Sequence, residues 1–120
     1  MTIQGAVAEI IKLRGKDIFK NLKQFLAFLE DLAPEYQKER KIIKNNFDDN
    51  ILGLFVDETK KPNQRLRWVQ IKLDDVGVAK DWADFIIESF GLAFGWEDEV
   101  RDLKVNAPIL DNAPKAQTQK

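Results

Sequence analysis

The segment from Lys80 to Trp96, KDWADFIIESFGLAFGW, is the most apolar part of the chain and constrains its fold more than any other. Its large apolar residues recur at the spacing of one helix face: Trp82, Phe85, Ile86, Phe90 and Ala93. A helix with so much aromatic surface must be covered by the rest of the chain or by a partner. We expect these side chains to form the centre of the core. Gly91 and Gly95 weaken regular helix, so the helix is expected to end near residues 90–94.

Five other segments show helical periodicity or helix-boundary residues: Ile3–Arg14, Leu22–Leu32, Glu35–Phe47, Asn50–Asp57 and Gln64–Leu73. Asn21 is placed to cap the second of them, and Pro34 ends that helix and suits the first turn of the next. Strand signals are weak, because alternating runs do not exceed about four residues and no Asn-Gly or Asp-Gly hairpin turn occurs. The sequence predicts an all-α fold, a compact bundle of five or six helices.

The C-terminal part of the chain differs in character from the rest. Residues 97–104 begin with three acidic residues that suit a helix N-terminus, and we expect one short helical turn there. Residues 105–120 contain two prolines and few large apolar side chains. We therefore expect a single helical domain over residues 1–104 and a flexible tail or linker over residues 105–120.

The 120-residue chain has a net charge of −1, but its charge is unevenly distributed. Residues 1–73 carry fourteen Lys/Arg and ten Asp/Glu, a net charge of +4. Residues 74–120 carry five Lys/Arg and ten Asp/Glu, a net charge of −5. Opposite charges of this kind favour an arrangement in which the two parts face each other, either within the fold or across a dimer. Bulk charge gives no argument for nucleic acid or an anionic membrane.

The chain contains neither histidine nor cysteine. This excludes disulfides, thiol nucleophiles, imidazole acid–base catalysis and zinc sites built on these residues. Ser89 is the only serine, and no histidine exists to activate it. We therefore expect a protein that is not an enzyme and that uses no cofactor.

Membrane and export signals are weak in this sequence. No apolar run reaches the ~18 residues that a transmembrane helix needs. The N-terminal segment has no basic region ahead of its apolar residues, so a signal peptide is not expected. We expect a cytoplasmic protein with no membrane contact, and the absence of cysteine fits a reducing compartment.

Acidic residues occur in pairs and triplets: Asp48–Asp49, Asp57–Glu58, Asp74–Asp75 and Glu97–Asp98–Glu99. None has the spacing of a calcium-binding loop, so we interpret them as helix caps and solubilising groups and expect no metal site. On the Lys80–Trp96 segment, Asp81, Asp84 and Glu88 follow one helix face. They either offer an acidic stripe to a partner or pair with Lys/Arg of the helices predicted at 35–47 and 64–73, and we favour the pairing.

The three tryptophans are the largest side chains, and a core of this size accommodates two or three of them. Tryptophan is also enriched at interface hot spots, which makes one of them a candidate for an exposed anchor. Trp96 is the best candidate, because it follows Gly95 and precedes a charged run.

Several segments share the pattern of a known domain: a Gly-Lys-Asp-Ile start at Gly15–Ile18, a Leu/Phe-rich helix at Leu22–Leu29, a break at Asp31–Pro34, a Glu/Lys/Arg-rich helix at Glu35–Lys44, and a last helix ending in Phe-Gly within Gly77–Gly91. In these features the chain resembles a small helical domain of unassigned function, an accessory module found beside different partners in multidomain bacterial proteins. The resemblance covers about residues 10 to 95. It implies a non-catalytic accessory module and supplies no functional residues to carry over.

The sequence favours a non-catalytic protein-interaction or adaptor module of a bacterial cytoplasmic protein, which binds a protein partner or self-associates. The candidate partner-binding residues are Trp96, Asp81, Asp84 and Glu88. One alternative is a nucleic-acid-binding domain that uses the basic surface of the third and fifth helices, with Lys38, Lys41, Lys44, Arg65 and Arg67. Glu35 and Glu39 lie in the same turns as the lysines and favour a solvated face instead. A second alternative is a small phage- or plasmid-encoded inhibitor of a host enzyme.

Overall fold

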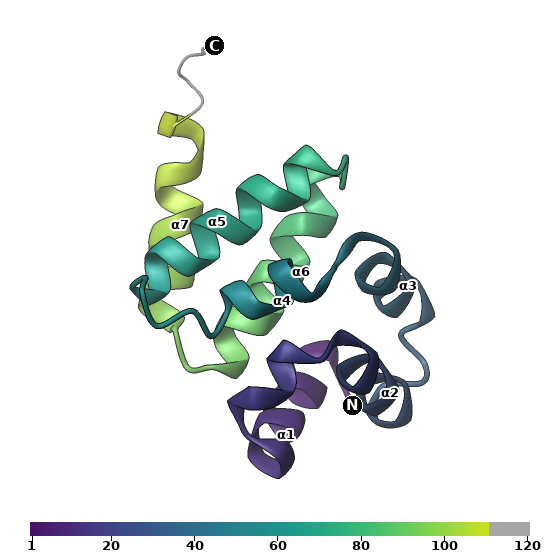
Figure 1. Ribbon diagram of the computed structural model, residues 1–120. Helices are drawn as coiled ribbons and strands as arrows, with labels where there is room; N and C mark the ends of the chain where they lie inside the picture. Colours follow the sequence, from purple (N-terminus) through teal and green to yellow (C-terminus); the bar gives the residue numbers. More distant parts are fainter. Residues whose placement is uncertain (111–120) are drawn as a thin grey trace.

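The computed structural model describes the backbone of residues 1–110 and the side chains of residues 1–103. The elements in chain order are α1 (Ile3–Arg14), the 3₁₀ helix η1 (Lys16–Lys20), α2 (Leu22–Leu32), α3 (Gln37–Asn46), α4 (Asp49–Leu54), α5 (Pro62–Asp75), α6 (Lys80–Ala93) and α7 (Glu97–Leu110). The backbone of residues 1–110 contains no strand, so the predicted all-α class is confirmed. In Figure 1, α1 and α2 lie at the bottom, α3 at the right, and α5 and α7 at the upper left, with α4 near the centre.

Local chemistry sets several helix boundaries where the sequence placed them. α1 has the expected bounds, and Gly15 follows it with a φ of 75°. The Asn21 side chain accepts a hydrogen bond from the Gln24 backbone N–H at 3.2 Å and begins α2. Asp48 does the same for Ile51 at 2.8 Å and begins α4. Each cap satisfies an N–H group that has no partner within its own helix.

The link between α2 and α3 departs from expectation. Pro34 lies in a turn rather than in the first turn of a helix, and α3 begins at Gln37. The Arg40 guanidinium donates hydrogen bonds to the carbonyls of Ala33 at 3.0 Å and Pro34 at 2.9 Å. The Tyr36 backbone N–H also donates to the Ala33 carbonyl, at 3.2 Å, so the turn after α2 is held both by the backbone and by a side chain of α3.

α7 is the largest difference from the expected architecture. It is a helix of 14 residues rather than a short turn, and with it the backbone of residues 1–110 forms seven α-helices instead of five or six. The domain boundary expected after residue 104 falls inside it, and residues 111–120 of the expected tail lie outside the described residues. α7 packs on α5 and α6, with Val100 buried between them. Gly91 permits this approach, because a Cβ added there would lie 2.5 Å from Val100 Cγ2.

The core is built around Phe90 of α6, which is fully buried. Its ring centroid lies 4.9 Å from that of Phe55, 5.7 Å from Phe25, 5.8 Å from Phe47 and 6.2 Å from Phe19. These four rings come from α2, η1 and the residues that follow α3 and α4. One side chain of α6 therefore joins four separate parts of the chain, which confirms the expected central place of this helix. None of the helices in residues 1–110 has both the length and the apolar character that a membrane crossing requires.

Candidate interaction surfaces

The outward side of α6 carries an aromatic pair. Phe85 is 40% exposed, and its ring centroid lies 6.3 Å from that of the partly buried Trp82 in an edge-to-face arrangement. The expectation that Phe85 belongs to the core is therefore wrong. α6 is apolar around much of its circumference, and α1, α5 and α7 cover the arc that contains Ile86 and Phe90. Periodicity marked Phe85 as apolar but did not determine which arc the neighbouring helices would cover.

The acidic residues of α6 do not share one role. Asp81 is exposed. Asp84 pairs with Lys80 of its own helix at 2.6 Å, and not with a basic residue of α3 or α5. Glu88 and Asp84 both line a small cleft of about 230 Å³ between α5, α6 and α7. Asp81 is therefore the one exposed member of these three acidic residues, and it lies one helical turn from Phe85.

Trp96 packs against the core and is partly buried. Its ring stacks on Phe94, with centroids 4.5 Å apart and an interplanar angle of 10°. The Arg65 guanidinium lies 5.6 Å from the centroid of the Trp96 ring. With intramolecular contacts to an aromatic ring and to a cation, Trp96 has the surroundings of a structural residue.

Arg40, Lys41 and Lys44 of α3 line one side of a groove between α2 and α3, and Lys38 lies outside it. Lys38, Lys41 and Lys44 are all exposed. The groove has a volume of about 620 Å³, and Lys41 and Lys44 line it from α3 while Lys23, Leu26, Ala27 and Glu30 line it from α2. We refer to it as the α2–α3 groove. Sequence reasoning missed the α2 residues, because only the packing of α2 beside α3 places Lys23 on the same surface as the lysines of α3.

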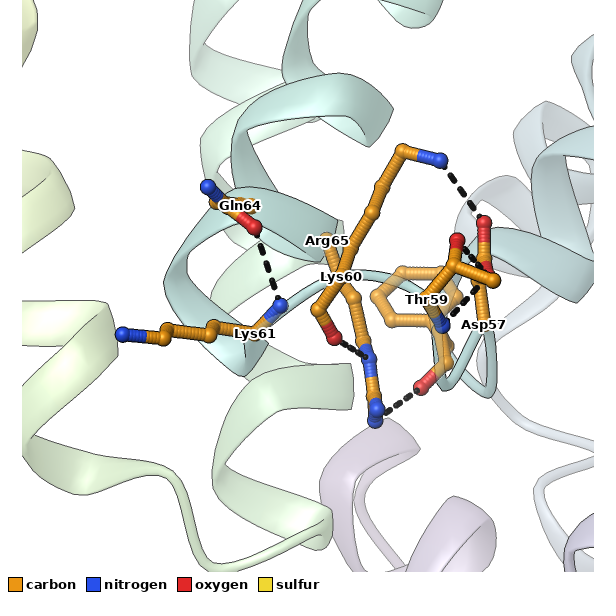
Figure 2. Close-up of polar contacts among 7 residues, drawn as sticks. Asp57, Thr59, Lys60, Lys61, Gln64 and Arg65 are labelled. Carbon is orange, nitrogen blue, oxygen red and sulfur yellow. Dashed lines mark hydrogen bonds and ion pairs between the residues drawn. The ribbon is translucent and has the colours of Figure 1, made fainter.

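Arg65 and Arg67 do not join this surface. α3 lies at the right of Figure 1, whereas the first turns of α5 lie at the left. Figure 2 shows the Arg65 side chain directed at backbone carbonyls of the segment before α5. Its Nε donates to the Lys60 carbonyl at 2.8 Å and its Nη1 donates to the Phe55 carbonyl at 3.4 Å. The structure thus separates Arg65 from the three lysines and gives it a structural role.

Asp57 organises the segment between α4 and α5 (Figure 2). Its carboxylate accepts hydrogen bonds from Lys60 Nζ at 2.8 Å, from the Thr59 hydroxyl at 2.6 Å and from the Thr59 backbone N–H at 3.0 Å. The hydrogen bond from Lys60, followed by those from Thr59, holds the pKa of Asp57 well below its ordinary value. The Lys60 ammonium also lies 5.7 Å from the Trp68 ring centroid.

Asp57 is expected to make stability depend on pH. Because its pKa is lowered in the folded protein, its contribution is complete above the unfolded-state pKa of about 3.9 and is lost as the pH falls below that value. Asp57→Asn should therefore lower the melting temperature at pH 7, and the difference from wild type should shrink progressively below about pH 4. Thermal melts followed by circular dichroism between pH 7 and pH 2.5 measure this. Glu58→Gln is the matched control, because Glu58 is exposed; an equal pH dependence in both variants would contradict the assignment.

The remaining cleft of similar size has mixed charge. It has a volume of about 680 Å³ and is lined by Lys16, Lys20 and Arg65 together with acidic residues that include Asp17, Asp49 and Glu58. Within the part of the chain that the structure describes, no three acidic residues are grouped so that they could hold a metal ion. Ser89 is buried in α6, so its hydroxyl does not face a cleft open to solvent.

Comparisons of the chain with protein-family models, with curated proteins and with solved structures give no match.

Proposed function

We propose that this chain is a non-catalytic protein-interaction module of a bacterial cytoplasmic protein. It docks its protein partner through the outward face of α6, which we define by Asp81, Trp82 and Phe85. The observation that carries the proposal is the 40% exposure of Phe85 beside Trp82. The resemblance to an accessory domain of multidomain bacterial proteins agrees with this role.

An exposed apolar residue by itself is ordinary, since folded proteins expose much apolar surface. Phe85 differs because it forms a pair with a second aromatic side chain and has an exposed carboxylate, Asp81, one helical turn away. Aromatic anchors within a polar rim are typical of protein interfaces. Trp68 is similarly exposed, at 43%, but its ring already contacts the Lys60 ammonium of the same chain. The α6 face is therefore the better docking surface.

Phe85→Ser should abolish partner binding without unfolding the protein. Leu13→Ser is the matched control, because Leu13 is 59% exposed on α1 and lies outside the α6 face. Immobilised wild type and both variants are incubated with bacterial lysate, and the bound proteins are compared after each variant has passed a circular dichroism melt. We expect one or more proteins bound by wild type and Leu13→Ser to be lost with Phe85→Ser. Identical binding by all three forms, with no association that depends on Phe85, would contradict the proposal.

A further inference from the structure

The two oppositely charged parts of the chain, Glu88 excepted, form their ion pairs separately within residues 1–103. Residues 74–103 carry nine Asp/Glu and two Lys/Arg. The ion pairs between side chains are Lys60–Asp57, Lys80–Asp84 and Arg101–Asp98, and each stays within one part. With Glu88 set aside, no ion pair among the side chains of residues 1–103 joins residues 1–73 to residues 74–103. Apart from Glu88, the ion pairs of the described side chains thus give no support to a pairing of the two parts within the fold, and a pairing across two copies is the other arrangement that the charge distribution favours.

The α2–α3 groove carries positive charge and an apolar lining, which suit the negative charge and the aromatic ring of the α6 face. Lys23, Lys41 and Lys44 supply exposed positive charge, and Leu26 and Ala27 supply apolar lining. The residues that line the groove come from α2 and α3 alone, so the net-acidic helices α6 and α7 do not line it. A groove lined by more basic than acidic side chains, and by apolar groups, complements an aromatic side chain that has an exposed carboxylate one helical turn away.

We infer that a second copy of this chain occupies the α2–α3 groove with the outward face of its α6. Phe85 of one copy packs against Leu26 and Ala27 of the other. Asp81, one turn or about 6 Å along α6 from Phe85, faces Lys41 and Lys44. The contact joins two different surfaces, so it closes a dimer where both surfaces of one copy meet the other copy at once, and otherwise it extends into a ring or a filament. This inference rests on the proposed function and identifies the partner.

Self-association is tested first on the wild-type protein. Sedimentation equilibrium over a dilution series should show a mass above the monomer value of 13.9 kDa that falls towards it on dilution. Association should weaken between 0.1 M and 1 M salt, because the screening length falls from about 10 Å to about 3 Å. A wild-type protein that stays monomeric up to about 1 mM would overturn the inference.

Charge exchange between the two surfaces tests the contact itself. The variants Lys41→Glu/Lys44→Glu and Asp81→Lys should each weaken self-association by about tenfold or more, because like charges then face each other. Mixing the two variants should restore association, since the reversed charges again attract. Lys12→Glu and Asp102→Lys are matched controls, because both residues are exposed and neither belongs to the groove or the α6 face. They should leave the dissociation constant within about twofold.

The other outcomes separate this inference from the proposed function. The proposed contact is wrong if the mixture of the groove variant and Asp81→Lys does not associate. It is also wrong if the two control variants weaken self-association as much as the charge-reversal variants do. If wild type is monomeric yet binds a different protein in a manner that depends on Phe85, the inference fails while the proposed function stands. If the groove variants change only the binding of a mixed-sequence DNA duplex at low salt, the groove is a nucleic-acid surface and the inference is overturned.

Discussion

Replacing Phe90 with alanine is expected to lower the free energy of unfolding by about 3–5 kcal/mol. The Phe90 ring is fully buried and lies within 6.2 Å, centroid to centroid, of four other phenylalanine rings. Its removal leaves a cavity that those rings, held by separate elements, do not fill without moving the backbone. Since whole domains are stable by about 5–15 kcal/mol, the variant should be largely unfolded or barely stable.

Phe85→Ala is the matched control for this experiment. It removes the same side chain from the same helix, but the ring is 40% exposed, so the expected loss is about 1 kcal/mol or less. Urea unfolding followed by circular dichroism measures both variants against wild type. If the two losses prove equal, the division of α6 into an inward arc and an outward face is wrong.

Arg65→Met should produce the second largest effect, a loss of about 2–3 kcal/mol. The substitution removes the charged hydrogen bond to the Lys60 carbonyl, the longer one to the Phe55 carbonyl and the cation–π contact with Trp96. Two partly buried carbonyls then lose their donor, and the segment that joins α4 to α5 loses its tie to the start of α7. Methionine keeps much of the side-chain volume, so lost packing does not account for the effect.

Two further variants show whether geometry or charge matters at this position. Arg65→Lys keeps the charge but cannot reproduce the planar fork of donors, so it should recover only part of the stability. Arg67→Met, two residues along α5, should change the free energy of unfolding by about 0.5 kcal/mol or less. Chemical denaturation at pH 7 gives all three values. A loss at Arg67 equal to that at Arg65 would show that positive charge on α5, rather than these contacts, stabilises the protein.

Local sequence determined the helical class and several of the helix boundaries and caps. α1 has the predicted bounds, Asn21 caps α2, and Asp48 caps α4. These features depend on side chains and backbone groups three or four residues apart, so they can be derived from short windows of sequence. The absence of histidine and cysteine likewise restricts the chemistry of the chain, whatever its fold.

Contacts between distant segments could not be derived in this way. The Leu22 backbone N–H at the start of α2 donates to Asp49 Oδ1 of α4 at 3.0 Å, a cap supplied from 27 residues away. α7 extends to Leu110, and Gly91 lets its Val100 pack closely against α6. Nothing within a few residues of either site signals these contacts, because each depends on a helix that arrives from elsewhere in the chain.

The candidate surfaces show the same division. The sequence identified Asp81 and the lysines of α3 as charged, and Phe85 and Trp96 as large and aromatic. Three features of these residues became known only from the tertiary structure. Phe85 is exposed, and the Arg65 guanidinium lies over the Trp96 ring. Lys23 and Lys41 line the same groove. The physical reason is that side-chain spacing determines which residues share a helix face, whereas the packing of neighbouring helices decides whether that face is buried or meets solvent.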